Sequence, residues 1–421
     1  MRFSPFLTAS GHSSSSVGAA AILLGLTLTP VAAQTSSNRT TEAGEATITD
    51  ATAECTAYYY PPTASQLYNF PPIWQPATLL ANDTAGQAKW AAIKDSVPTN
   101  IPVKGTLAGD FSTFTPTYNA SDPDCWWTYN KCVTPKLATL QPDISSVPEP
   151  MTLGYGFDDG PNCSHNAFYD YLSEQKQKAT MFYVGSNVMD WPLEAQRALA
   201  DGHEICVHTW SHHYMTAFQS EDAFAELWYT LNAIKLAIGV TPTCWRPPFG
   251  DTDDRIRAIA KGLGLRTILW QYDSNDWQVG ATAGITPADV DSNYQSLISH
   301  AQNGTFATQG AIILTHELNN FTMSEAVKWY SQLKSTFTGG IVPVGVAMNT
   351  TQPYLEGNYS LPSYSQYKSG VVLTTGSASA VPTQSGGAAQ GHTADGALAL
   401  PAHLGLAVVA ALVGGAARVF L

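Results

Sequence analysis

The sequence predicts an α/β protein whose main domain is a distorted, incomplete (β/α) barrel of about seven parallel strands. Between residues 149 and 348, short apolar runs alternate with stretches of helical periodicity. Such alternation indicates parallel β/α units. Polar residues stand at the carboxyl end of one run after another, where a barrel presents its functional side chains. A doubly wound open sheet is the alternative architecture.

The expected elements follow one another in a regular order. The apolar runs are expected to be strands at 151–159, 179–185, 204–209, 242–249, 266–273, 311–317 and 341–347. Amphipathic patterns between them predict helices at 165–177, 192–201, 223–238, 254–263, 289–301 and 324–337. Their lengths fit buried strands and the crossover helices that parallel strands need.

The composition of the 421 residues favours a globular protein that does not bind polyanions. Lys and Arg number 20 against 33 Asp and Glu, so the net charge is −13, and no nucleic-acid partner is expected. Apolar residues make up 44% of the chain and aromatic residues 11%, which is too much buriable surface for a disordered protein. Charged residues reach 13%, about half the usual share. Such a surface suits a neutral polymer such as a polysaccharide.

Residues 1–33 are expected to be a secretory signal peptide. An apolar stretch runs from Val17 to Ala33, follows Arg2 and ends in small residues, which is the pattern of a cleavable signal. An N-terminal membrane anchor is the alternative.

Residues 386–421 are expected to be a glycosylphosphatidylinositol (GPI) anchor signal that follows a polar linker at 349–385. Small residues at Ser385, Gly386 and Gly387 precede a polar spacer and an apolar stretch from 397 to 421. This order describes a tail that is exchanged for lipid, with Ser385 as the expected attachment residue. A C-terminal transmembrane helix is the alternative. Either anchor would place the protein at the outer face of a membrane.

Cysteines and sequons agree with a secretory route. Six cysteines, an even number, fit an oxidising compartment. Cys125 and Cys132 are near enough in sequence to close a small loop, whereas Cys206 and Cys244 could pair or remain buried thiols. No C-x-x-C occurs, so a metal role for the cysteines is not expected. The expected N-glycosylation sites are Asn38, Asn82, Asn119, Asn162, Asn303, Asn320, Asn349 and Asn358.

Residues 34–148 are expected to form an irregular, glycosylated N-terminal arm. The segment is rich in Pro, Thr, Asn and Tyr, and its one convincing helical stretch is 84–93. Its aromatic residues, Tyr58 to Tyr60, Trp126 and Trp127, are expected to pack on the main domain, although they could instead stack on sugar rings.

Two histidines and two aspartates at expected strand ends indicate a metal site. His208 and His212 stand at i and i+4, a spacing that lets two imidazoles reach one ion. No glutamate follows the first histidine, as it would in H-E-x-x-H, so the general base must come from elsewhere. Asp158 and Asp159 can supply it, because at a strand end one carboxylate can bind metal while its neighbour reaches a water molecule. Two histidines and one carboxylate describe a hydrolytic metal site, whereas a simple turn is the alternative for Asp-Asp-Gly.

Five short motifs in order carry a family resemblance. They are GFDDGPN (156–162), HTWSH (208–212), RPPFGD (246–251), DSNDW (273–277) and LTHE (314–317). Together they resemble the motifs of the polysaccharide deacetylase family (carbohydrate esterase family 4, the NodB homology domain), and most closely its fungal chitin deacetylase branch. The resemblance covers about residues 150–345, and it implies a distorted barrel with a bound Zn²⁺ or Co²⁺ ion.

The resemblance also implies a role for each matching residue. Asp159, His208 and His212 would bind the metal, and Asp158 would be the general base. Arg246 would orient Asp158, and Asp273 would set the protonation of His316, the general acid. The main-chain N–H of Phe249 would help to hold the oxyanion, although tyrosine is common at this position. Trp277 and Leu314 would line the pocket for the acetyl methyl group.

These roles fit the physical needs of amide hydrolysis, which requires an activated water, a stabilised oxyanion and a protonated leaving amine. The expected function is the removal of N-acetyl groups from chitin or chitooligosaccharides, giving chitosan and acetate, by a secreted, membrane-anchored fungal wall enzyme. The alternatives are an esterase that acts on another acetylated polysaccharide such as xylan, and a wall-anchored carbohydrate-binding protein. No protein partner can be inferred.

Overall fold

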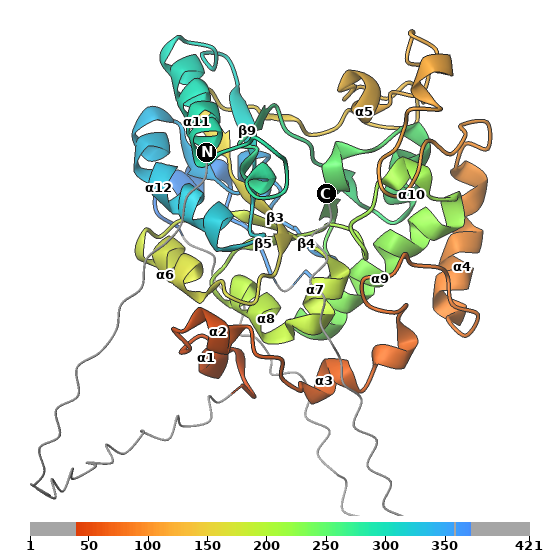
Figure 1. The fold of residues 1–421 in the computed structure, drawn as a ribbon, viewed down its shortest axis with the longest axis horizontal. Coiled ribbons are helices and arrows are strands. Elements are labelled where there is room, and N and C mark those ends of the chain that lie inside the picture. Colours follow the sequence, from red (N-terminus) through yellow and green to blue (C-terminus); the bar gives the residue numbers. More distant parts are fainter. Residues whose placement is uncertain (1–38, 358, 372–421) are drawn as a thin grey trace, which may run out of the picture. The chain divides into compact units, whose positions relative to one another are not determined.

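The computed structural model describes residues 39–357 and 359–371, and its centre is a ring of strands surrounded by helices (Figure 1). The expected signal peptide, the tail 386–421 and the residues Asn38, Asn358 and Ser385 lie outside the described residues. Within the described part of the chain, no helix is long and apolar enough to cross a membrane.

The strands form one sheet in which nearly all neighbours are parallel. Their order is β10-β2-β9-β3-β4-β5-β6-β7, and β1 and β8 pair with β9. Only β1 runs antiparallel to its named partner. The strands are β1 (Ser146–Val147), β2 (Thr152–Gly154), β3 (Gly156–Gly160), β4 (Thr180–Tyr183), β5 (Glu204–Val207), β6 (Cys244–Trp245), β7 (Arg266–Thr267), β8 (Tyr272–Asp273), β9 (Gly310–His316) and β10 (Gly340–Val342).

A short segment before β2 closes the sheet into a ring. Ile144 forms a parallel bridge to Ile268, one residue beyond β7. Two residues later, Ser146 in β1 pairs with Ala311 in β9. The path from β9 through β3, β4, β5, β6 and β7 therefore returns to β9. This closure confirms the distorted barrel and excludes the open doubly wound sheet.

Two of the expected strands are each divided in two. The run 151–159 becomes β2 and β3, because β2 pairs with β10 and β9, whereas β3 pairs with β9 and β4. Both β2 and β3 pair with β9, but at Tyr155, between Gly154 and Gly156, the chain changes its other partner strand from β10 to β4. A Cβ atom at Gly156 would lie 2.7 Å from the carbonyl oxygen of Thr180, so only glycine allows this close approach. The run 266–273 divides likewise into β7 and β8.

The helices predicted between the strands are all present, with ends that differ by up to four residues. Gly239 caps the C-terminus of the long helix α9, and its φ of 82° is the left-handed conformation that glycine favours there. The structure adds α7 (Gly185–Asp190), which the sequence did not predict, directly after β4. The six predicted helices are α6 (Asn166–Glu174), α8 (Pro192–Ala200), α9 (Ser220–Ile238), α10 (Asp254–Gly262), α11 (Pro287–Gln302) and α12 (Asn320–Thr336).

The interior of the barrel holds an apolar cluster, and polar side chains stand where the strands have their carboxyl ends. The buried interior cluster includes Phe182, Ile268 and Ile312 together with Cys206 and Cys244, which form a disulfide between β5 and β6. Because side chains alternate along a strand, residues two positions further on share the same face. His208, Arg246 and Leu314 stand two positions beyond interior residues, and His316 stands four beyond Ile312. The alternation therefore carries these side chains to the mouth of the barrel.

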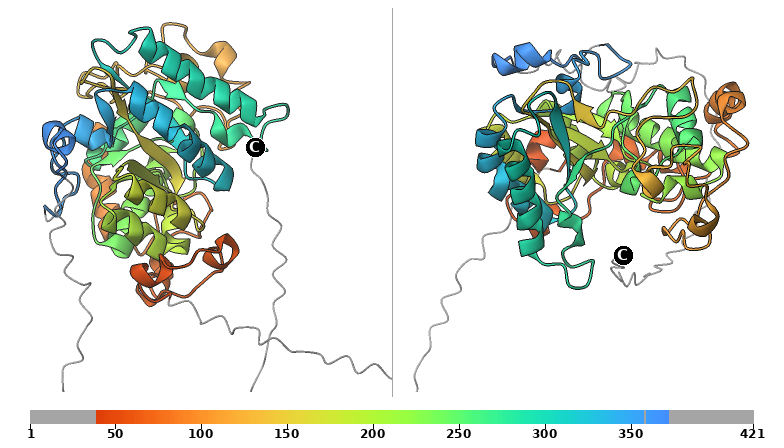
Figure 2. Two further views of the ribbon diagram at one scale, coloured as in Figure 1. Left: turned by 90° about the vertical axis from the view of Figure 1, so that its left-hand side faces the viewer. Right: turned by 90° about the horizontal axis from the view of Figure 1, so that it is seen from above.

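The N-terminal segment packs on the barrel along its length, as Figure 2 shows for the red and orange ribbon. Trp126 and Trp127 are buried, and the Tyr58 hydroxyl donates to Glu194 on α8. The expected packing of these aromatic residues is therefore confirmed, while Tyr59 stays exposed. A disulfide joins Cys55 to Cys163. The helices of this segment are α1 (Glu42–Glu45), α2 (Ala51–Glu54), α3 (Pro61–Ala64), α4 (Thr84–Ile93) and α5 (Trp127–Asn130).

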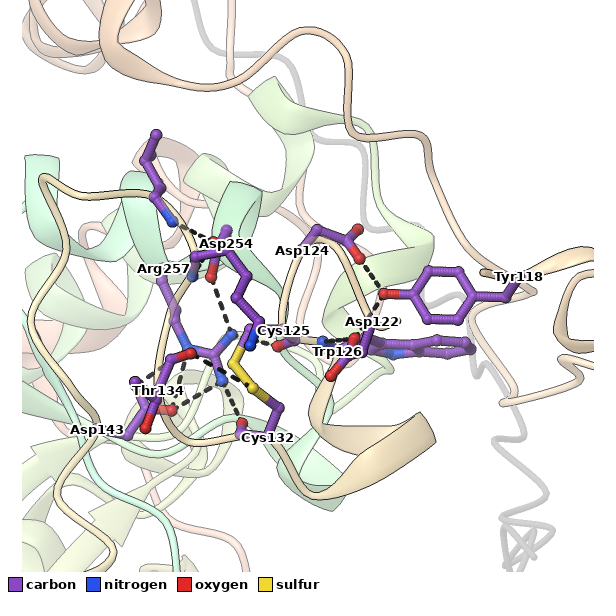
Figure 3. The surroundings of a disulfide bond; sticks show 12 residues. Tyr118, Asp122, Asp124, Cys125, Trp126, Cys132, Thr134, Asp143, Asp254 and Arg257 are labelled. Carbon is purple, nitrogen blue, oxygen red and sulfur yellow. Dashed lines mark hydrogen bonds and ion pairs between the residues drawn. A yellow bond between two sulfur atoms is a disulfide. The ribbon is translucent and has the colours of Figure 1, made fainter. Parts of the chain in front are cut away.

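A disulfide loop of this segment is bound to α10 by one arginine. Cys125 and Cys132 are bonded, as their spacing suggested. The Arg257 guanidinium donates to the carbonyl oxygens of both cysteines and to the carboxylate of Asp143 (Figure 3). Nearby, the Asp254 carboxylate accepts from two main-chain N–H groups of the segment. The first turns of α10 are thus a charged anchor for residues 125–143.

Residues 349–371 were expected to begin a polar linker, but those that the structure describes pack on the barrel. Tyr354 is buried and its hydroxyl accepts from the Ile205 N–H. The short helix α14 (Tyr364–Lys368) follows α13 (Val344–Ala347), and its Tyr367 hydroxyl accepts from the Lys178 N–H. The difference arises because aromatic residues in this stretch find partners far away in sequence.

The sequons differ in their surroundings. Asn82, Asn119, Asn303, Asn320 and Asn349 are exposed, which suits a modified side chain. Asn162 is half-buried, and its side-chain N–H donates to the Leu318 carbonyl at 2.7 Å. A glycan on Asn162 would have to disturb this contact. Occupancy of all these sites stays a prediction.

A fully buried lysine provides a test of how the N-terminal segment is held. The Lys104 ammonium lies 2.6 Å from the Asp124 carboxylate and also pairs with Asp253, the N-terminal capping residue of α10. We expect Lys104→Ala to lower the free energy of unfolding by about 3–5 kcal/mol, because it leaves two buried carboxylates without a cation. Chemical denaturation measures the loss.

The exposed pair Lys94–Asp95 supplies the control. Lys94→Ala should change stability by less than about 0.5 kcal/mol, because exposed ion pairs contribute little. Equal effects of the two substitutions would contradict the anchoring role of Lys104.

Candidate active site

Three of the sequence-predicted residues come together at the mouth of the barrel. Asp159 is the last residue but one of β3, while His208 and His212 follow β5. The Asp159 Oδ1 atom lies 3.4 Å from His208 Nε2 and 3.0 Å from His212 Nε2. Their potential ligand atoms all lie within 4.8 Å of one another. Tetrahedral ligands at about 2.0 Å from Zn²⁺ would be about 3.3 Å apart, so the spacing fits one small divalent ion.

The hydrogen bonds around this group also fit a metal. His208 Nδ1 contacts the Arg246 carbonyl oxygen at 2.7 Å, so Nδ1 carries the proton and Nε2 keeps its lone pair for a ligand. The buried Asp159 Oδ1 has no hydrogen-bond partner, which is costly unless a cation binds there. Burial opposes ionisation of Asp159, but the facing histidines outweigh it and hold its pKa well below the ordinary range.

A second group with metal-ligand chemistry does not qualify. Glu204, Cys206 and Cys244 also lie close together. The two sulfur atoms are joined in a disulfide, and only the thiolate form of cysteine binds metal. Among the residues that the structure describes, Asp159, His208 and His212 are thus the group suited to a metal.

The loop that carries the histidines has an unusual backbone. Thr209 has a φ of 65° and His212 a φ of 56°, although non-glycine residues rarely adopt the left-handed region. Asp159 has a φ of 73°. Such conformations persist where surrounding contacts hold them, and they concentrate at functional sites.

Asp158 stands beside the three potential ligands and is bonded to a buried arginine. Arg246 Nη1 donates to Asp158 Oδ1 at 2.7 Å, and Asp158 Oδ2 lies 3.6 Å from His208 Nε2. Burial lowers the pKa of Arg246, and the Asp158 carboxylate opposes that decrease. The guanidinium also lies over the Phe182 ring, 3.9 Å from its centroid. Arg246 is therefore bonded to one oxygen of Asp158 and leaves the other oxygen beside His208, an arrangement that suits the predicted orienting role.

His316 is held by a different aspartate from the one that the sequence analysis named. His316 Nδ1 lies 2.6 Å from Asp276 Oδ1, and the His316 main-chain N–H donates to Asp276 Oδ2. The expected pairing of His316 with Asp273 is corrected accordingly. Both aspartates belong to the same five-residue motif, but Asp273 ends β8 beside Leu314, whereas Asp276 lies in the following turn. The second aspartate of DSNDW was the available signal.

The Asp276 carboxylate determines the charge of His316. Burial alone would lower the pKa of the imidazole, but Asp276 outweighs burial and raises that pKa to about 10. His316 is therefore an imidazolium at neutral pH, with Nε2–H available as a proton donor. Burial raises the pKa of Asp273, and the charge of His316 opposes this rise, so Asp273 acts on His316 through space.

The other predicted site residues lie around the same mouth. The Phe249 ring lies edge-on to His212 at 4.8 Å and stacks on Tyr214 at 4.1 Å, and Phe249 has a φ of 57°. Leu314 is buried on β9 between Ile312 and His316. Trp277 is half-buried and follows Asp276 in a 3₁₀ turn.

The N-terminal segment adds residues that the sequence analysis did not place at the site. Trp127 lies 4.7 Å from Trp270 between ring centroids, and Trp270 lies beside Arg246. The Lys131 ammonium lies 3.4 Å over the Trp127 ring. Burial lowers the pKa of Lys131, and the charge of Asp273 opposes this. No local pattern in residues 126–131 could have indicated the contacts with Trp270 and Asp273, because these partners lie more than 100 residues away.

The family can now be assigned from comparisons with known proteins. Residues 147–268 match the family model for polysaccharide deacetylase. Chitin deacetylase 2 of Cryptococcus neoformans var. grubii is 55% identical over 336 residues, which are 79% of this chain and 73% of that protein. The chain belongs to the polysaccharide deacetylase family. Chitin deacetylase of Amylomyces rouxii is 47% identical over 315 residues, 73% of each chain.

Among solved structures, the chitin deacetylase from Colletotrichum lindemuthianum covers 49% of this chain and 90% of its own. Its TM-score is 0.44 and its sequence identity 23%. The family assignment rests on the sequence matches alone.

The partner of His316 can be tested by titration. We expect Asp276→Asn to lower the pKa of His316 toward the ordinary value for imidazole, because the substitution removes the carboxylate bonded to Nδ1. NMR titration of the His316 ring in the metal-free protein measures this pKa. Asp273→Asn is the matched control and should shift the pKa less, since Asp273 makes no bond to the ring. A larger shift in the control would reinstate Asp273 as the main partner.

Proposed function

We propose that this protein hydrolyses the N-acetyl groups of N-acetylglucosamine units in chitin, giving chitosan and acetate. The observation that carries the proposal is the pairing of Asp158 with His316 at facing positions of β3 and β9. A carboxylate and an imidazolium thus stand side by side next to the metal-binding group. The substrate is supported by the relatives named chitin deacetylase.

The proposed reaction uses one residue to accept a proton and another to donate one. Asp158 accepts a proton from the water whose oxygen attacks the amide carbonyl carbon. The C–N bond then breaks, and His316 donates a proton to the departing nitrogen. Acetate and a free amine are the products. The high pKa of His316 keeps its proton in place until the amine leaves.

The remaining residues orient these two groups and hold the ion. Asp159, His208 and His212 would hold a divalent cation, for which we propose Zn²⁺ or Co²⁺. Such an ion lowers the pKa of water and polarises a carbonyl. Arg246 keeps the Asp158 carboxylate aimed at the site through the bond from Nη1. The main-chain N–H of Phe249 is proposed to face the oxyanion, and Trp277 and Leu314 to contact the acetyl methyl group.

Substitution of the two neighbouring aspartates tests this assignment. We expect Asp158→Asn to lower kcat for acetate release from chitin oligomers by about 10²- to 10⁴-fold, because the proton acceptor is lost. Its Zn²⁺ content should stay that of the wild type. Asp159→Asn should instead lose Zn²⁺, because a ligand is removed. Acetate assays and metal analysis of the same samples separate the two effects.

The choice of substrate shows which alternative holds if the proposal fails. Acetate release from acetylated xylan but not from chitin oligomers would indicate an esterase. Chitin binding without acetate release in the presence of Zn²⁺ would indicate a carbohydrate-binding protein. Full turnover by Asp158→Asn would reject the base assignment.

We further propose that the protein is secreted and attached to the outer face of the plasma membrane by a GPI anchor at Ser385. Three disulfides among the described residues support an oxidising compartment. The small-residue site, spacer and apolar tail of the sequence support lipid attachment.

Enzymatic release tests the anchor. Treatment of wall-free intact cells with a phosphatidylinositol-specific phospholipase C should release the protein. We expect this because the lipid is the only attachment to the membrane that the proposal includes. Immunodetection in the supernatant measures the release. Retention after treatment, with extraction by detergent alone, would indicate a transmembrane helix instead.

A further inference from the structure

We propose that Glu226 is a positioning residue of the metal site: its buried carboxylate holds the loop between His208 and His212 in the shape that aims both imidazoles at one ion. This inference rests on the proposed function, because it takes these histidines as ligands. Glu226 lies on α9, outside all five family motifs, and is fully buried.

The carboxylate of Glu226 is surrounded by hydrogen-bond donors. Glu226 Oε2 accepts from the main-chain N–H groups of Trp210 at 2.9 Å and Ser211 at 2.8 Å. Glu226 Oε1 accepts from Ser211 Oγ at 2.6 Å and from the Ala77 N–H at 2.7 Å. Three of the four donors thus belong to the two adjacent residues in the middle of HTWSH. An ionised carboxylate is the side chain that satisfies four donors at once.

The loop needs such support because its backbone is unfavourable. Thr209 and His212, on either side of the two bonded residues, both have positive φ, a region that non-glycine residues occupy only when neighbours hold them there. The change of direction at these positions brings His212 back toward His208, so that both Nε2 atoms lie near Asp159 Oδ1. Release of the central residues would let His212 move away.

The same loop is held from two other sides. The Thr209 carbonyl accepts from the Gly185 N–H, and the Trp210 carbonyl accepts from Ser186 Oγ at 2.7 Å, both in α7. The Trp210 indole N–H donates to the Pro72 carbonyl, and the Phe70 ring stacks on Trp210. With Ala77 on Glu226, residues 70–77 of the N-terminal segment therefore take part in shaping the metal loop.

A second buried glutamate provides a matched control. Glu204 is also buried within the barrel, at the opposite end of β5, where its Oε2 accepts from Thr180 Oγ1 and the Gly345 N–H. Burial raises the pKa of both glutamates. Glu204 contacts neither the loop nor the N-terminal segment in these bonds, so the two residues share their burial and differ in what they hold.

The experiment compares Zn²⁺ binding by the full-length mature protein with Glu226→Gln or Glu204→Gln. We expect E226Q to bind Zn²⁺ about 10-fold more weakly or worse, the range of losses seen when groups supporting metal ligands are removed. Whichever way the amide is turned, its N–H₂ would face at least one main-chain N–H, that of Ala77 or those of Trp210 and Ser211, so the four bonds cannot all be kept. E204Q should bind Zn²⁺ like the wild type even if it melts at a lower temperature. Isothermal titration calorimetry with Zn²⁺ measures both affinities.

Acetate release at increasing Zn²⁺ supplies a second readout. E226Q should regain activity at high Zn²⁺, which a purely structural defect would not allow. Wild-type affinity in folded E226Q, or an equal loss in E204Q, would overturn the inference. If E226Q does not fold, Ser211→Ala replaces it: that variant loses one of the four bonds, and unchanged Zn²⁺ affinity there would overturn the inference too.

These measurements distinguish a failure of the inference about Glu226 from a failure of the proposed function. If the wild-type protein binds no Zn²⁺ or releases no acetate from chitin oligomers, the function itself is rejected. If the wild type does both and E226Q matches it in affinity, only the role of Glu226 is rejected.

Discussion

The active-site arrangement depends on the two contacts that Arg246 makes at the end of β6. Its guanidinium donates to the Asp158 carboxylate, and its carbonyl oxygen accepts from His208 Nδ1. One buried residue thus orients the proposed base with its side chain and a proposed metal ligand with its main chain. The disulfide two residues earlier, between Cys206 and Cys244, joins the strands that carry His208 and Arg246. The charge of Arg246 also compensates the cost of burying a carboxylate beside other acidic groups.

The N-terminal segment is part of the structure that supports this site. Asp251, at the end of RPPFGD, accepts from the Trp126 indole and from both the N–H and the hydroxyl of Thr216. A single buried carboxylate therefore connects the segment, the loop after β6 and the turn that follows the histidines. Glu226 makes a similar connection through Ala77. Buried carboxylates at such junctions need several donors at once, and this need restricts how the joined segments can move.

Sequence patterns predicted the elements with strong periodicity and missed those set by distant contacts. The helices between the strands were found because their apolar faces repeat, and the residues at the mouth were found because they end apolar runs. Helix α7 is only six residues long and lacks a clear amphipathic pattern. The choice between Asp273 and Asp276 depends on how the turn after β8 folds against β9, which spacing along the chain does not reveal. The donors around Glu226 come from residues 77, 210 and 211, so their meeting could not be read locally.

The closing of the ring through Ile144 and β1 has a practical consequence for where the catalytic unit begins. The domain expected at 149–348 leaves out both pairings. A gene fragment starting at residue 149 would encode β7 and β9 without the strand between them, so their main-chain groups would face solvent. Unpaired strand edges recruit other chains, and such a fragment would tend to aggregate. The smallest autonomous enzyme must therefore begin no later than Ile144, upstream of the expected boundary and of its first catalytic motif.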